Sequence, residues 1–249
     1  MTTSTTEVTS LEPSELGTRE YWDNVYAREI TNHTDDHDDE GTNWFDEYSA
    51  EERVIDKLES IAERGILHKS GEGASRILDL GTGNGHMLFA LREPNEDDLE
   101  PWTGDMVGVD YSVPSIDLAR QIASQRQIEP SIQFETCDLL CEEPGEWLQG
   151  GFDLVLDKGT FDAISLMPQS GEVHTCDVYF NQVVKLVKPG GLLAITSCNW
   201  TKAELLTWLS HSSQQTGLQY FDEAQYQTFS FGGMTGSSIV SLIFRRAPT

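Results

Sequence analysis

The segment from Asp79 to Gly85 reads Asp-Leu-Gly-Thr-Gly-Asn-Gly and joins a short apolar run to a helical one. Glycines in such a turn let a ligand approach the backbone, and free N–H groups at the start of the next helix can receive an anion. A dinucleotide fingerprint would place its third glycine at position 86, where this chain has His86. The spacing therefore favours a smaller ligand without a pyrophosphate. We expect its binding residues to be Asp79, Gly81, Thr82, Gly83, Asn84 and Gly85.

Two further carboxylates follow apolar runs. Asp110 stands 25 residues after Gly85 and precedes Tyr111. An acid at that strand end can accept hydrogen bonds from both hydroxyls of a ribose, and a helix-entry role is the alternative. Asp138 follows the next run and could accept from an adenine amino group, with Leu139 against the ring, although aspartate is also common in turns. Together these positions predict a nucleoside site.

The hydrophobic pattern shows which elements must position these acids. Short apolar runs alternate with intervals long enough for a helix, which predicts repeated βαβ units and an α/β fold with a mostly parallel sheet. The expected strands are Ile77–Leu80, Met106–Val109, Ile132–Phe134, Phe152–Leu156 and Leu192–Thr196. Two more runs, Tyr226–Phe231 and Ile239–Phe244, flank a glycine-rich loop and predict a hairpin. We therefore expect the last strand to be antiparallel to its neighbour.

The N-terminal part of the chain has a different composition. Residues 1–15 are rich in Ser and Thr and are predicted to form a disordered tail. Residues 16–48 are predicted to be a helical and acidic extension that forms a lid over cofactor and substrate. Within it, Thr18 is the expected cap of a helix, and an acidic loop follows at 34–41. The remainder, 49–249, is predicted to be one domain.

The first helix of that domain is expected to begin at Ser49-Ala50-Glu51-Glu52, which has the pattern of a capping box. Gly65 is expected to end it. Its apolar face, which needs a sheet to cover, consists of Val54, Ile55, Leu58, Ile61 and Ala62.

Composition limits the classes of partner. The chain has 249 residues, of which 16 are basic and 42 acidic, giving a formal charge of −26. Such a charge disfavours nucleic acid and anionic lipid and favours a basic partner. Four cysteines without paired spacing and the lack of a signal-like N-terminus predict a reducing, intracellular compartment. His33 and His37 lie in an Asp-rich stretch that we interpret as a solvated loop, so no metal site is expected.

The acids and the glycine loop, with Lys188-Pro189-Gly190-Gly191 before the fifth run, resemble the class I S-adenosylmethionine-dependent methyltransferases over about residues 49–246. The resemblance implies a Rossmann-like, seven-stranded sheet with an antiparallel last strand and helices on both faces, preceded here by the N-terminal extension. It also implies S-adenosylmethionine as cofactor and S-adenosylhomocysteine as product. The methionine part would lie on the glycine loop, the ribose on Asp110 and the adenine near Asp138.

The fourth run ends in Asp157-Lys158-Gly159-Thr160-Phe161-Asp162-Ala163 rather than in the Asn/Asp-Pro-Pro-aromatic motif of many class I base and amide methyltransferases. This ending is similar to eukaryotic protein-lysine methyltransferases. The resemblance is narrowed to the protein-lysine methyltransferases that act on translation elongation factor 1-alpha by two N-terminal segments, Leu16–Asp23 and Trp44-Phe45. It implies mono- or dimethylation of a lysine of that factor in the cytoplasm, and a role in intracellular transport. We expect a monomer without nucleic-acid or membrane partners.

A lysine amine must lose a proton before its lone pair can attack a methyl group. Asp157 is predicted to accept a hydrogen bond from that amine, and a helix-cap role is the alternative. Lys158 could pair with a carboxylate of cofactor or substrate. The expected walls for the lysine stem, which could instead be core residues, are Trp22, Tyr26, Trp44 and Phe45.

Two other functions fit the same residues. A small-molecule methyltransferase would use the same cofactor site, with the N-terminal helix as a lid over its acceptor. A non-catalytic adaptor would bind S-adenosylmethionine without turnover.

Overall fold

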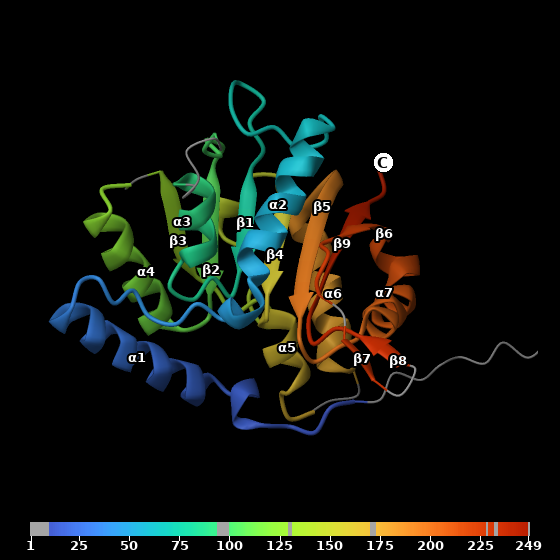
Figure 1. Cartoon of the computed structure of the whole chain (residues 1–249), viewed down its shortest axis with the longest axis horizontal. Helices are drawn as coiled ribbons and strands as arrows, with labels where there is room; N and C mark the ends of the chain where they lie inside the picture. The colour runs from blue at the N-terminus through green and yellow to red at the C-terminus, as the bar shows by residue number, and fades with distance from the viewer. Residues whose placement is uncertain are drawn as a thin grey trace, which may run out of the picture.

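The computed structural model describes residues 10–93, 100–128, 131–169, 173–227, 229–231 and 234–248. Its main sheet has seven strands in the order β3-β2-β1-β4-β5-β9-β6 (Figure 1). Strands β1 to β5 pair in parallel, and β9 is antiparallel to both of its neighbours, which confirms the expected topology. The strands are β1 (Ile77–Leu80), β2 (Met106–Asp110), β3 (Ile132–Thr136), β4 (Phe152–Lys158), β5 (Val187–Ser197), β6 (Leu218–Glu223) and β9 (Val240–Arg246).

Helices cover both faces of this sheet, as predicted. Ile77 of β1 packs in a core formed with α2 (Ala50–Glu63), α3 (His86–Arg92) and α4 (Val113–Gln125). Its neighbour Leu78 points the other way, into a core formed with α5 (Thr160–Ser165), α6 (Thr175–Leu186) and α7 (Lys202–Thr216). The strand side chains alternate between the two cores because β-strands have a period of two. Both faces are buried, so the central strands are apolar throughout.

The N-terminal extension crosses the edge of the sheet at which β1, β2 and β4 end (Figure 1). It contains η1 (Glu15–Gly17), α1 (Arg19–Asp35) and η2 (Asp46–Tyr48), and α1 packs against α4. The expected cap is confirmed, because the Thr18 side chain accepts a hydrogen bond from the Tyr21 amide. Residues 10–19, called the N-terminal strap below, lie along α5 and α6. Residues 1–9 of the predicted tail lie outside the described residues.

The strap is attached to the body by hydrogen bonds over long sequence separations. Ser10 Oγ is 3.0 Å from His174 Nε2, and the Ser14 amide donates to the Leu166 carbonyl at 3.1 Å. A Cβ on Gly17 would come within 2.3 Å of that same carbonyl oxygen, so the strap backbone lies directly on the backbone of Leu166.

The start of α2 differs from the prediction, although its apolar face is confirmed. Ser49 has a left-handed backbone with φ 49° and its side chain makes no capping hydrogen bond, so the predicted capping box is wrong. Instead the Ser49 carbonyl accepts from the Arg53 amide, and Glu51 binds His86 Nδ1 at 2.6 Å. The Glu51 carboxylate thus links α2 to α3 instead of closing the end of α2.

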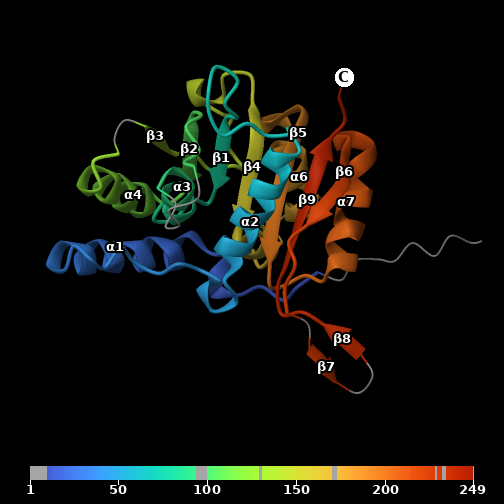
Figure 2. The same ribbon diagram turned by 45° about the horizontal axis from the view of Figure 1, so that its top comes forward.

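The predicted C-terminal hairpin is also wrong. Strand β7 (Phe229–Phe231) pairs with β8 (Met234–Gly236) in a separate two-stranded sheet, which projects from the body (Figure 2). The partners of β9 are β5 and the unpredicted β6. As the last strand of the sheet, β6 has one partner strand, and its Tyr220 is 43% exposed. Strand β6 therefore lacks the continuous apolar run that makes a buried strand visible in the sequence.

Candidate active site

The loop after β1 needs glycine at two positions. Gly81 and Gly83 both have φ +59°, which L-residues rarely adopt. A Cβ on Gly81 would lie 2.1 Å from Thr160 Oγ1, and one on Gly83 would lie 2.6 Å from Tyr26 Oη. The loop is therefore held between α5 and α1, with bare backbone facing both.

Two buried carboxylates adjoin this loop. Asp79 is 3% exposed and accepts from Thr82 Oγ1 at 2.8 Å, while Asp110 is 6% exposed and accepts from the Gly83 amide at 3.1 Å and the Ser112 amide at 2.9 Å. Burial raises the pKa of Asp79 to about 7 and also raises that of Asp110. Buried carboxylates are costly without a cationic partner, so this loop is suited to a positively charged ligand.

A strand-end pocket opens beside Asp110, where the ends of β1, β2 and β3 meet. Asp138 lies in its wall, and its carboxylate accepts from Arg19 Nη2 at 2.9 Å and from the Leu140 amide at 3.1 Å. Arg19 also donates to the Tyr111 carbonyl and lies 4.6 Å from the centre of the Tyr111 ring. The residues that line the pocket include Leu16, Arg19, Leu80, Gly81, Val109, Asp110, Tyr111, Cys137, Asp138, Leu139, Leu140 and Ile164.

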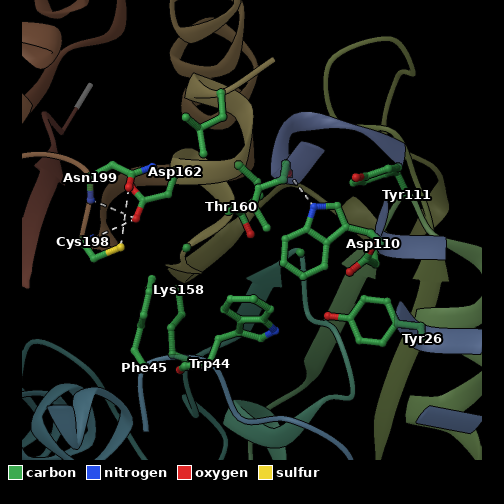
Figure 3. A pocket seen from close by; sticks show the side chains of 16 residues that line it. Tyr26, Trp44, Phe45, Asp110, Tyr111, Lys158, Thr160, Asp162, Cys198 and Asn199 are labelled. Carbon is green, nitrogen blue, oxygen red and sulfur yellow. Dashed lines mark hydrogen bonds between the residues drawn. The ribbon is translucent and has the colours of Figure 1, made fainter. Parts of the chain in front are cut away.

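An aromatic pocket adjoins the first one and shares Leu16, Gly81, Asp110, Tyr111 and Thr160 with it (Figure 3). The four aromatic residues singled out from the sequence all line it. The ring centroids of Trp22 and Trp44 are 5.1 Å apart, and Trp22 Nε1 donates to the Leu16 carbonyl at 2.7 Å. The lining residues include Trp22, Tyr26, Trp44, Phe45, Lys158, Thr160, Asp162, Ala163, Leu166, Cys198 and Asn199.

Phe45 is held in an unusual conformation at this pocket. Its backbone is left-handed with φ 69°, which is an outlier for a bulky side chain. Its ring is 9% exposed, and a Cβ on Gly159 would lie 3.1 Å from it. Such a conformation costs about 1–3 kcal/mol and is concentrated at functional sites, so the placement of this ring is a specific feature of the pocket.

Lys158 lies between the aromatic pocket and a third, smaller pocket that contains Asp79, Thr82, Gly83 and Asn84. Its Nζ donates to Asn43 Oδ1 at 2.9 Å and to the Trp44 carbonyl at 2.8 Å. Burial lowers the pKa of this amine. These hydrogen bonds hold the segment that carries Trp44 and Phe45, and the pairing of Lys158 with a carboxylate of cofactor or substrate stays a prediction.

The structure places Asp157 in none of these three pockets. Its carboxylate is 2% exposed, accepts from the Phe161 amide at 3.1 Å and lies 2.5 Å from Tyr179 Oη. Burial raises its pKa to about 7. This position matches the cap alternative and gives no support to contact with an acceptor amine.

Sequence reasoning gave no site role to several residues of the aromatic pocket, among them Thr160, Asp162, Cys198 and Asn199. Cys198 and Asn199 directly follow β5, so the rule that ligands bind beyond the carboxyl ends of parallel strands could have found them. Thr160 Oγ1 donates to the Leu80 carbonyl at 2.7 Å, a contact that no local pattern reveals.

Two features are absent from the residues that the structure describes. No group of three or more His, Cys, Asp or Glu side chains there could hold a metal ion. No helix in that part of the chain is long and apolar enough to cross a bilayer.

Comparison with known proteins places this geometry in a class. A methyltransferase domain family matches residues 72–235. The magnesium protoporphyrin IX methyltransferase of Synechocystis, solved with bound S-adenosylmethionine, has the same fold at a TM-score of 0.56 and 14% identity, covering 96% of this chain and 100% of that one. The sheet order, the glycine loop and these matches define a class I methyltransferase that uses S-adenosylmethionine.

Closer relatives identify the family. The protein-lysine N-methyltransferase efm4 of Schizosaccharomyces pombe is 41% identical over 97% of this chain and 98% of its own length. EFM4 of Saccharomyces cerevisiae is 39% identical over 94% and 96%, and human EEF1A lysine methyltransferase 2 is 36% identical over 94% and 88%. The chain belongs to this family of S-adenosylmethionine-dependent protein-lysine methyltransferases, as the sequence motifs predicted.

Proposed function

We propose that this chain methylates a lysine of translation elongation factor 1-alpha, in mono- and dimethyl steps, in the cytoplasm. The observation that carries the proposal is the aromatic pocket, which shares a wall with the strand-end pocket and is lined by Trp22, Tyr26, Trp44 and Phe45. Aromatic faces attract the cationic end of a lysine and pack on its aliphatic stem. The human relative at 36% identity is named as an EEF1A lysine methyltransferase, which supports the same acceptor.

The residues present fit the cofactor. Bare glycine backbone, two buried carboxylates and an apolar wall at Val109, Cys137 and Leu139 suit a cationic nucleoside. We assign its ribose to Asp110 beside Tyr111. We assign its methionine part to the loop from Asp79 to Gly85, and its adenine to Leu139 with Asp138.

When bound, S-adenosylmethionine supplies a methyl group on a positively charged sulfur, and S-adenosylhomocysteine remains after transfer. The chain's own residues must then align one amine nitrogen with that methyl group and exclude water from it. Trp44 and Phe45 are placed to hold the stem, because Lys158 fixes their backbone and Gly159 leaves room for the Phe45 ring. Alignment of this kind converts an encounter into an oriented reaction.

The charge of the N-terminal part supports a basic protein partner. Residues 1–70 contain 18 acidic and 6 basic side chains, and this part of the chain supplies Trp22, Tyr26, Trp44 and Phe45 to the aromatic pocket. An acidic surface raises the encounter rate with a basic partner. The proposed monomeric state and the implied transport role stay predictions.

The proposal is tested by incubating the chain with tritiated S-adenosylmethionine and recombinant elongation factor 1-alpha, then measuring intact masses. Mass gains of about 14 and 28 Da on the factor, absent with Asp110→Ala, are expected. A parallel incubation replaces the recombinant factor with a cell extract. Label found only in the metabolites of that extract would indicate a small-molecule acceptor. Binding without transfer would indicate an adaptor.

The N-terminal strap and the first turn of α1 form the proposed lid of the strand-end pocket. Arg19 makes the contacts that hold this lid against the pocket. The Arg19 side chain joins the lid to Asp138 and Tyr111, and Tyr111 Oη donates to the Thr18 carbonyl at 3.4 Å. Arg19→Ala is expected to speed dissociation of S-adenosylhomocysteine about 5- to 30-fold, because roughly 1–2 kcal/mol of charged and cation–π contact is lost. Stopped-flow tryptophan fluorescence measures this rate, with Trp22 as a reporter near the pocket.

Arg28→Ala provides the matched control, since Arg28 is an exposed arginine on the same helix. Its dissociation rate should equal that of the wild type. An Arg19→Ala rate no faster than that of Arg28→Ala would contradict the lid assignment.

A further inference from the structure

Asp162 is a buried carboxylate in the wall of the aromatic pocket, and the reaction described above leaves it unused. It is 5% exposed and belongs to the first turn of α5. Figure 3 shows it together with Cys198 and Asn199 on one side of the pocket, with Asp110 and Tyr111 on the other. Asp162 therefore lies at the end away from the proposed ribose site.

The Asp162 carboxylate is fixed by donors from the end of β5. Ser197 Oγ donates to one oxygen, and the amides of Cys198 and Asn199 donate to the other at 2.8 and 3.3 Å. The Cys198 thiol also donates to this carboxylate, so all of its donors come from the end of β5 and together they orient the group. The structure thus holds a charged acceptor in one orientation at the pocket wall.

No other carboxylate among the described lining residues has this position. The aromatic pocket contains two carboxylates, Asp110 and Asp162, and Asp110 accepts from the glycine loop on the cofactor side. Asp157 is on the same β4–α5 segment but bonds to Tyr179 and the Phe161 amide away from the pocket. An ammonium group entering between Trp44 and Phe45 would therefore meet Asp162.

We propose that Asp162 binds the ammonium of the acceptor lysine and takes its proton before transfer, an inference that rests on the proposed function. The proton passes from nitrogen to a carboxylate oxygen, which leaves a neutral amine. The nitrogen lone pair then forms the N–C bond while the C–S bond breaks and its electron pair stays on sulfur. Asp162 afterwards releases the proton to solvent, so charge and atoms balance.

The surroundings of Asp162 are suited to this exchange. Burial raises its pKa, which brings the carboxyl closer to the amine in basicity. The titratable groups nearby are the Cys198 thiol, whose pKa burial raises to about 12, and the Asp157–Tyr179 pair. The thiol is neutral over the working range. Of the other titratable groups that line the pocket, Lys158 donates to the Trp44 carbonyl and Asp110 accepts from the Gly83 amide. Asp162 is therefore the carboxylate on the side of the pocket away from the cofactor site.

The test compares Asp162→Asn with Asp157→Asn, the same substitution five residues apart. With elongation factor 1-alpha as acceptor, Asp162→Asn should lower kcat about 10²- to 10⁴-fold and abolish the acid limb of the kcat/KM pH profile. Its Kd for S-adenosylmethionine should stay within threefold of the wild type. Asp162→Glu should restore part of kcat, and Asp157→Asn should keep kcat within about fivefold.

A binding probe separates this inference from the proposed function. n-Butylammonium should quench the tryptophan fluorescence of the S-adenosylhomocysteine-loaded wild type, but not that of Asp162→Asn, and n-butanol should quench neither. If the wild type labels no elongation factor while this difference is seen, the proposed substrate fails and the ammonium site stands.

Two results would overturn the inference. One is kcat of Asp162→Asn within tenfold of the wild type; the other is equal ammonium quenching in both proteins. If Asp162→Asn does not fold, Asp162→Glu and Ser197→Ala keep a carboxylate while moving or loosening it. They should then change kcat at constant cofactor Kd, and unchanged kcat in both would refute the assignment.

Discussion

Asp110→Ala is expected to raise the Kd for S-adenosylmethionine at least about 100-fold. The substitution removes the proposed ribose acceptor and leaves the amides of Gly83 and Ser112 without their partner. A hydrogen bond to a charged group contributes about 1.5–3 kcal/mol, and the loss of about 2.7 kcal/mol of ribose binding corresponds to 100-fold in affinity. The glycine loop, which Asp110 connects to β2, would also lose its fixed position. Isothermal titration calorimetry of the purified chain measures the change.

The matched control is Asp117→Ala, because Asp117 is exposed on the helix that follows β2. It should bind the cofactor as the wild type does. A thermal melt accompanies each titration, so that loss of fold is distinguished from loss of the ribose contact. An Asp110→Ala protein that melts normally and binds within fivefold of the wild type would refute the assignment.

Cofactor affinity is expected to fall about 50-fold between pH 7 and pH 5. Asp79 has a pKa of about 7 because it is buried, and a cationic ligand favours its charged form. The charged fraction of Asp79 falls from about one half at pH 7 to about one hundredth at pH 5, and the affinity should fall with it. The charged groups acting on Asp79 are Lys158, Glu51 and Asp110. Calorimetry at four pH values gives the slope, which Asp79→Asn should flatten.

The contribution of Asp79 to folding stability should change with pH in the direction opposite to the cofactor affinity, which provides an internal check. The folded pKa of Asp79 is above its unfolded value of about 3.9, so the folded state binds more protons between pH 4 and 7. The contribution of Asp79 to stability is therefore present at low pH and is lost as the pH rises through 7. The melting temperature of the wild type, minus that of Asp79→Asn, should fall from pH 5 to pH 8. If the cofactor affinity and this difference in melting temperature both fell at low pH, titration of Asp79 could not explain the loss of affinity.

The parts of the fold that could be predicted are those with a strong local signal. Strands β1 and β2 are buried along their whole length, the glycine loop follows β1, and Asp110 is the last residue of β2. Edge strand β6 has no such run, and the left-handed backbone at Ser49 depends on packing around it. Local sequence propensity determines the central strands, whereas tertiary contacts determine β6 and the backbone at Ser49.

The site shows the same division. Asp157 follows the predicted strand Phe152–Leu156, but β4 extends to Lys158, and alternation along the strand puts Asp157 on the face of Val155, toward α6 and Tyr179. Asp162 belongs to the motif of residues 157–163, but it reaches the pocket because the end of β5 holds it. The ion pair of Arg19 with Asp138 joins residues 119 apart in sequence. Such distant pairings are set by the assembled sheet and cannot be read from spacing.

The N-terminal strap has a consequence for the order of folding. Its described partners include Tyr111, Asp138, Leu166 and His174, which come 92 to 164 residues later than the strap residues that bond to them. Closing loops of that size is entropically costly, and contacts across them form after the local ones. On the ribosome the strap emerges before the strands of the sheet, yet its contacts with Leu166 and His174 can form only after those residues have been synthesised. This early segment therefore completes the catalytic site late, which delays cofactor capture until the sheet that must hold it has formed.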